Sequence, residues 1–85
     1  MKTFKDLRFK PQDFSDGIQA KMKFPNGYGI SVIKSKFSYG GDEGFYECAV
    51  LKDGSLCYDT PVTDDVIGWC TEEKVTEIMK QIQEL

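Results

Sequence analysis

The chain has 85 residues, of which 40% are hydrophobic and 13% aromatic, so it has enough apolar side chains for one domain with a modest core. It contains no histidine, which excludes mechanisms that need an imidazole base or an imidazole metal ligand. The net charge is −3, with eight Lys/Arg against three Asp over residues 1–40 and three Lys against eleven Asp/Glu over residues 41–85. We expect the two halves to pair within one fold; the alternative is an acidic surface for a basic partner.

Residues 1–17 are expected to form an N-terminal arm that begins with a turn capped by Thr3 and contains Phe4, Leu7, Phe9 and Phe14. We predict that the arm folds back over the outward face of the sheet, on a patch made by Ile33, Phe45, Ala49 and Leu51. If the arm does not cover it, this patch is a surface for a partner or for a homodimer. The first residues lack a secretory signal and no apolar run reaches the roughly 18 residues of a membrane span, which favours a cytoplasmic protein.

The segment from Phe24 to Tyr28 predicts a hairpin with a three-residue loop. Pro25 and Asn26 would form the centre of a type I turn, and Gly27 would take a left-handed conformation. This loop makes one face of the hairpin wholly apolar, with the pairs Phe24–Tyr28, Met22–Ile30 and Ala20–Val32.

Lys52-Asp53-Gly54 predicts a second three-residue loop, with the pairs Val50–Leu56 and Cys48–Tyr58. In that register Cys57 lies on the face of the sheet opposite Cys48, so no disulfide can join them. The three cysteines, which include Cys70, match no Cys-x-x-Cys spacing, and we expect reduced, partly buried thiols and no zinc site.

Two loops carry the remaining polar motifs. The glycine-rich loop 38–44 lacks a following helix and contains two acids, so it is a poor phosphate site. Residues 60–70 are expected to form an acidic turn containing a short helical turn, with Thr63 as its cap and Asp64 and Asp65 at its positive end. With Asp59 these aspartates lack the spacing of a calcium loop, and we predict no metal and no cofactor.

A final helix is predicted over residues 71–84, with Thr71 as its N-cap. Its apolar face follows the three-four spacing of a helix, through Val75, Ile78, Met79, Ile82 and Leu85.

Together these elements predict a single α+β domain over residues 1–85. Its sheet is a four-stranded antiparallel β-meander within residues 18–59, with strands near 18–24, 28–36, 45–51 and 55–59. The C-terminal helix is expected to pack on the face that carries Met22, Ile30, Val32, Tyr46, Cys48 and Val50.

The run from Tyr39 to Leu51, the run from Tyr58 to Gly68 and the phrase Thr71-Glu-Glu resemble small uncharacterised proteins encoded by tailed bacteriophages and prophages. The resemblance covers residues 24–85. It implies a cytoplasmic, phage-encoded accessory protein that acts in an infected bacterium, and it transfers no catalytic residue.

The expected function is non-catalytic binding of a host or phage protein with a basic surface, for instance to block a host defence or nucleic-acid-processing factor. The expected binding surface consists of Tyr39, Asp42, Glu43, Asp64, Asp65 and Trp69. The first alternative is a module that sequesters a nucleotide or another small molecule between the two loops, stacked on Tyr39 and Trp69. The second alternative is a structural or dimeric protein.

Two other classes are disfavoured. A hydrolase using Asp64, Asp65 or Cys70 lacks an orienting base, so we predict no enzyme. Direct nucleic-acid binding is also disfavoured, because the sequence lacks a basic run with interleaved aromatic residues.

Overall fold

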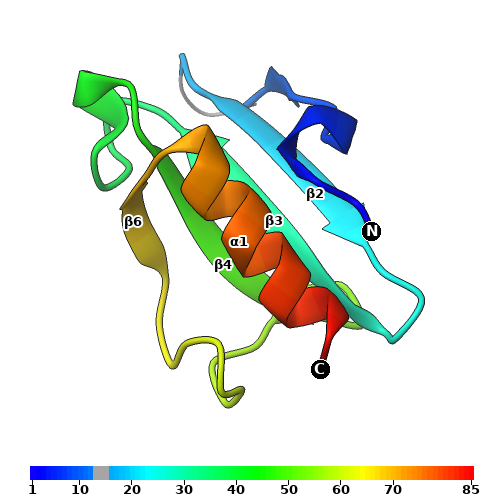
Figure 1. The fold of residues 1–85 in the computed structure, drawn as a ribbon. Coiled ribbons are helices and arrows are strands. Elements are labelled where there is room, and N and C mark those ends of the chain that lie inside the picture. The colour runs from blue at the N-terminus through cyan, green and yellow to red at the C-terminus, as the bar shows by residue number, and fades with distance from the viewer. Residues whose placement is uncertain (13–15) are drawn as a thin grey trace.

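The computed structural model describes residues 1–12 and 16–85 and contains one antiparallel sheet with a helix packed on it (Figure 1). Its strands run in the order β1-β2-β3-β4-β5, and β6 pairs with β4. Their bounds are β1 Lys10–Pro11, β2 Ile18–Lys23, β3 Tyr28–Lys34, β4 Tyr46–Lys52, β5 Ser55–Leu56 and β6 Ile67–Cys70. The helix α1 spans Glu72–Gln83, and two short 3-10 turns are η1 at Phe4–Asp6 and η2 at Gly41–Glu43. The predicted α+β meander with a C-terminal helix is therefore confirmed, with β1 and β6 as additions.

The first hairpin has the predicted loop and register. The amide of Phe24 donates to the carbonyl oxygen of Tyr28 at 2.7 Å, and Met22 pairs with Ile30. Gly27 is left-handed, with φ +89°. The tip of the hairpin also reaches the helix, because the Asn26 side-chain amide donates to the carbonyl oxygen of Ile82 at 2.9 Å.

The predicted register of the second hairpin is wrong. Asp53 (φ +52°) and Gly54 (φ +86°) are both left-handed, so the loop has two residues and Leu51 pairs with Leu56. Such a loop follows the right-handed twist of the flanking strands, which a three-residue loop achieves only with a bulge. The shift moves Leu56 outward, where it is 57% exposed, and brings Cys57 against the core on the same side as Cys48. The strand β5 accordingly ends at Leu56 and not at residue 59.

Residues 60–70 contain a strand where a helical turn was predicted. The Thr63 hydroxyl accepts from the Asp65 amide and donates to its carbonyl oxygen, which closes a side-chain turn without a helix. The next residues form β6, in which Cys70 lies opposite Tyr46. Because β5 pairs only with the end of β4, the first half of β4 has one edge free of β5, and β6 forms hydrogen bonds along that edge.

The core lies between α1 and the sheet. The Thr71 hydroxyl accepts from the Lys74 amide at 3.1 Å, which confirms the predicted N-cap. The helix buries Val75, Ile78, Met79 and Ile82 against Ile30, Val32, Cys48 and Val50. Leu85 was placed on this face but lies beyond the end of α1 and is 38% exposed.

The arm packs beside the helix and not on the outward face of the sheet, which corrects the prediction. Phe4 and Phe9 lie against the Tyr46 ring, with centroids 5.1 and 5.5 Å away, and Leu7 is buried. The Phe4 amide donates to the Thr76 hydroxyl on α1 at 3.1 Å. One helix, about 10 Å wide, is narrower than a sheet with strands about 4.8 Å apart, so the arm covers the rest of the core.

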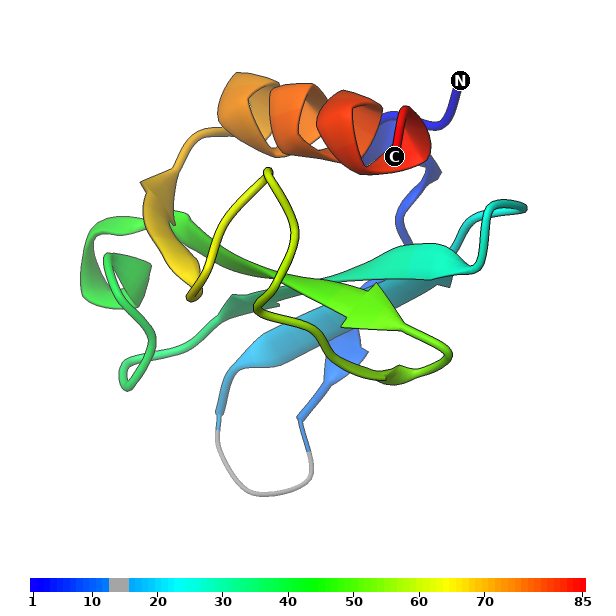
Figure 2. The ribbon, with the colours of Figure 1, turned by 90° about the horizontal axis from the view of Figure 1, so that it is seen from below.

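The turn predicted at the start of the arm exists as η1. The Asp6 carboxylate accepts from the Thr3 amide at 2.9 Å, and this hydrogen bond lowers the pKa of Asp6. Phe14, the fourth apolar residue predicted for the arm, lies outside the described residues. Of the described arm residues, η1 lies beside α1 and β1 joins the sheet next to β2, so neither η1 nor α1 covers the opposite face of the sheet (Figure 2).

Two glycine substitutions test the hairpins. We expect Gly27→Val and Gly54→Val each to lower the free energy of unfolding by more than about 1 kcal/mol, because a β-branched residue resists a left-handed backbone. A Cβ at Gly54 would meet no atom within 4 Å, so the loss there is backbone strain alone. Urea denaturation measures the loss, with Gly54→Asn as a control because asparagine tolerates this conformation. Unchanged midpoints for both valine variants would contradict the turns described here.

Candidate aromatic–acidic surface

The exposed Tyr39 and Trp69, together with the half-buried Phe45, form an aromatic patch where the loop 38–44 meets β6. Tyr39 is 64% exposed and Trp69 is 57% exposed, while the Phe45 ring lies 5.8 Å from the Trp69 ring. Phe37, just before this loop, is 78% exposed. Side chains of this size are the ones that contribute most to protein interfaces.

Hydrogen bonds hold the loop 38–44 in place. The Glu47 carboxylate, on β4, accepts from the Tyr39 amide at 2.9 Å. The Tyr39 carbonyl oxygen in turn accepts from the Trp69 amide at 3.2 Å, and the Gly40 carbonyl oxygen accepts from the Phe45 amide at 3.0 Å. A Cβ at Gly40 would lie 3.0 Å from the indole ring, so only glycine lets the loop pack this closely on Trp69. The patch is therefore anchored to the sheet.

Trp69 has a strained backbone. Its φ is +56°, in the left-handed region that bulky residues avoid. This left-handed residue lies where the pairing of β6 with β4 is irregular. Its conformation turns the Trp69 side chain to solvent, while the next residue, Cys70, is fully buried. Left-handed non-glycine residues cost about 1–3 kcal/mol and concentrate at functional sites.

Four of the six predicted surface residues come together. Asp42 and Glu43 are exposed on η2, within the loop that packs on Trp69, and their carboxylates form no hydrogen bond or ion pair with the described residues. Asp64 and Asp65 precede β6, whereas the loop contacts the later residues of this strand (Figure 1). The Asp65 carboxylate also accepts from the Val66 amide at 2.8 Å, which gives it a structural role. We call Tyr39, Asp42, Glu43, Phe45 and Trp69 the aromatic–acidic surface.

The sequence interpretation missed two residues of this site. Phe45 was assigned to the outward sheet patch, but it lies before β4 and packs on Trp69. Glu47 was not singled out, yet its carboxylate accepts a hydrogen bond from the Tyr39 amide and so holds the backbone of Tyr39. Glu47 was recognisable only as an acid among apolar residues of a strand.

The two loops that were to form a nucleotide cleft are in direct contact. A Cβ at Gly68 would lie 2.4 Å from the Cβ of Tyr39, so no base fits between Tyr39 and this part of β6. Binding of a nucleotide or another small molecule on Tyr39 and Trp69 stays a prediction.

The charged halves of the chain do not pair through side-chain contacts. Within residues 1–12 and 16–85 the only ion pair joins Lys74 and Glu77, 3.6 Å apart on the exposed side of α1. The two halves pack within one fold, as expected, but their described residues form no ion pair with each other. Apart from Lys74 and Glu77, the charged side chains of the described residues therefore face solvent without a direct ionic partner.

The cysteines are free and serve packing. Cys48 and Cys70 are buried, and their hydrogen bond together with burial raises the pKa of Cys48. The half-buried Cys57 donates its S–H to the Asp59 carboxylate at 2.9 Å, which lowers the pKa of Asp59. In the described part of the chain, no three Cys, Asp or Glu side chains are grouped so that they could hold a metal ion.

Comparisons with protein-family models, curated proteins and solved structures find no match to this chain. None of the described helices has the length and apolar character needed to cross a membrane. The functional argument consequently rests on the aromatic–acidic surface itself.

Proposed function

We propose that the protein is a non-catalytic binding protein and that its aromatic–acidic surface recognises the basic surface of another protein. One observation carries the proposal: Trp69 has a left-handed backbone, yet its side chain is 57% exposed. A strained backbone that leaves a tryptophan in water gives the isolated domain little in return. Burial of the Trp69 ring by a partner would contribute binding free energy that offsets the strain, because buried tryptophans rank among the strongest interface contacts.

The charges near Trp69 define the chemistry of the partner. Asp42 and Glu43 have no cationic neighbour in an ion pair, so their field is available to a lysine or arginine of another protein. Such charges mainly accelerate encounter and select partners, while the aromatic side chains supply affinity. The surface therefore suits a partner that places apolar side chains next to basic ones.

The resemblance to phage-encoded proteins supports a biological setting for this binding. In that setting the partner is a protein of the phage or of its bacterial host, and binding serves to block a host defence or nucleic-acid-processing factor. Such factors carry basic surfaces because they bind nucleic acid. The proposal includes no catalytic residue and no cofactor.

Charge reversal tests the proposal and locates the surface. A tagged wild-type protein is used to capture its partner from lysate of the native bacterium, and the purified pair is then titrated at two salt concentrations. We expect Asp42→Lys with Glu43→Lys to weaken the affinity at least about tenfold and to reduce its salt dependence. The matched variant, Asp64→Lys with Asp65→Lys, carries the same charge change outside the aromatic–acidic surface and should weaken it less.

Three outcomes would contradict the proposal: no stoichiometric protein partner, equal binding by both charge-reversal variants, or a partner whose affinity does not depend on salt. Thermal melts of both variants show whether the fold survives. We expect small changes at residues 42 and 43, whose carboxylates bond to nothing in the described part of the chain, and a larger change where the Asp65–Val66 hydrogen bond is lost.

A further inference from the structure

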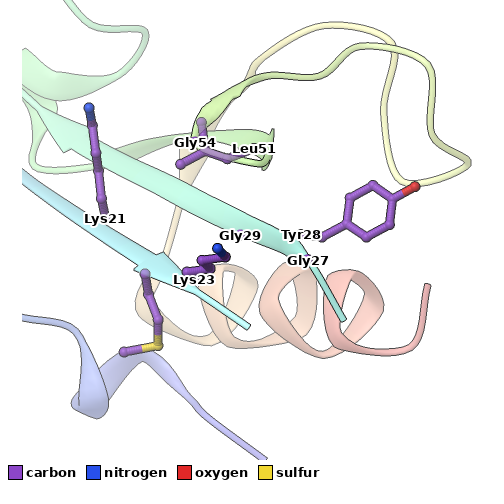
Figure 3. Close-up of a pocket in the computed structure, with 8 residues that line it drawn as sticks. Lys21, Lys23, Gly27, Tyr28, Gly29, Leu51 and Gly54 are labelled. Atoms are coloured by element: carbon purple, nitrogen blue, oxygen red, sulfur yellow. The ribbon is translucent and has the colours of Figure 1, made fainter. Parts of the chain in front are cut away.

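The face of the sheet opposite α1 has a hollow between the two hairpins (Figure 3). Its volume is about 240 Å³, and its lining includes Lys21, Lys23, Gly29, Leu51 and Gly54. A Cβ at Gly29 would lie 2.5 Å from the carbonyl oxygen of Met22, so the floor is bare backbone and admits no side chain. Leu51 provides an apolar wall and is 8% exposed.

The rim of the hollow is basic. Lys21 and Lys23 are exposed on β2, beside the hollow (Figure 3). Lys21 also lines a second hollow of about 370 Å³, whose lining includes Arg8 and Lys10. The two hollows are therefore neighbours, and the four cations extend along β1, β2 and the residues before β1.

These four cations have no counter-ion in the described part of the chain. None of them takes part in an ion pair, although the protein as a whole carries more acids than bases. Gln19, which lines the second hollow with Lys21, donates its side-chain amide to the Ser31 hydroxyl at 3.0 Å. The cations on the rim are thus the groups on this face that lack a partner of opposite charge.

We propose that this face binds an acidic protein segment that carries one large apolar side chain. The apolar side chain occupies the hollow above Gly29, against Leu51. Carboxylates on either side of it pair with Lys21 and Lys23, and further acids reach Arg8 and Lys10 in the second hollow. Charge complementarity selects this occupant, because an acidic segment supplies the counter-ions that the chain does not provide.

A nucleic-acid strand would meet the same charges but fits this face less well. Single strands bind through aromatic rings on which their bases stack. Tyr28 also lines the hollow, but it is partly buried against the core and Lys52 lies over its ring. The exposed aromatic side chains of the described residues do not line the hollow: Phe37, Tyr39, Tyr58 and Trp69. The apolar hollow at Leu51 would also remain empty along a phosphate backbone.

This site goes beyond the proposed function, since it has the opposite charge and does not use the aromatic–acidic surface. A protein with both sites joins a basic partner on one side to an acidic partner on the other. The uneven distribution of charge between residues 1–40 and residues 41–85 would then serve the binding of two different partners.

Selection from a displayed library of random nine-residue peptides on the full-length protein tests the site. We expect enriched peptides with several Asp or Glu residues around one Leu, Ile or Phe. The affinity of a synthetic enriched peptide should fall at least about tenfold with Lys21→Glu plus Lys23→Glu. It should change less than about twofold with Lys74→Glu plus Lys80→Glu, a matched reversal of two exposed lysines on α1. Replacing the apolar residue of the peptide with Ser should also lower the affinity about tenfold.

Several results would overturn the proposal. One is a library that enriches no acidic peptide on the wild type, and another is equal binding by the two double variants. Equal affinity for a nine-nucleotide oligothymidine would show general attraction of polyanions. A dimer, seen by light scattering, that Lys21→Glu plus Lys23→Glu dissociates without any peptide binding would make this face an interface between two copies. Trp69→Asn should leave peptide binding unchanged, so failure of this site is distinguishable from failure of the proposed function.

Discussion

Replacing Ile82 with alanine should lower the free energy of unfolding by about 2–5 kcal/mol. Ile82 is fully buried in the core between α1 and the sheet, and its removal leaves a cavity that the neighbouring side chains fill only in part. A domain of this length is stable by roughly 4–13 kcal/mol, so the variant loses a large share of its stability. Urea denaturation with a two-state fit measures the change.

Leu85→Ala is the matched control for Ile82→Ala. Leucine and isoleucine lose the same number of carbon atoms when they become alanine, but Leu85 is 38% exposed beyond the end of α1. We expect the control to cost less than about 1 kcal/mol. Equal losses for the two variants would mean that the C-terminal residues pack differently from the arrangement described here.

Replacing Trp69 with asparagine should weaken binding of the basic partner at least about thirtyfold, which corresponds to the roughly 2 kcal/mol of an interface hot spot. Asparagine removes the indole but tolerates the left-handed backbone, so the turn in β6 can persist. The fold loses the contact with Phe45 and is relieved of backbone strain, and these changes offset each other in part. Calorimetric titration of the purified pair measures the affinity.

Tyr58→Asn serves as the control for Trp69→Asn. It also removes an exposed aromatic side chain, 42% exposed on the loop after β5 and outside the aromatic–acidic surface. We expect the control to bind the partner with unchanged affinity. If the two variants bind equally well, Trp69 has no role in recognition and its exposure needs another explanation.

The two hairpins show when a sequence predicts its own register. In the first hairpin only one loop length collects Ala20, Met22, Ile30 and Val32 on the same face, so the alternation is decisive. In the second, β4 is apolar on both faces: Cys48 and Val50 point to the core, while Ala49 and Leu51 are also nearly buried on the other side. Either loop length then looks acceptable, and the twist of the sheet selects the shorter one.

The candidate site was predictable in part. Tyr39, Asp42, Glu43 and Trp69 stand out as aromatic and acidic residues outside the regular elements, and they do come together. The separation of Asp64 and Asp65 from them depends on β6, a strand of four residues that is too short to show a period in sequence. It exists because β4 offers an unpaired edge, which is a property of the sheet and not of the segment.

The sequence by itself determined the local features, and with them the α+β class. These features are the Thr71 cap, the apolar face of α1 and the register of the first hairpin. These depend on residues within a few positions of one another, whose spacing is visible along the chain. Tertiary structure decided the second register, the strand β6, the left-handed backbone of Trp69 and the side of the sheet on which the arm packs. Each of these depends on an edge, a twist or an uncovered part of the core that exists only after distant segments have assembled.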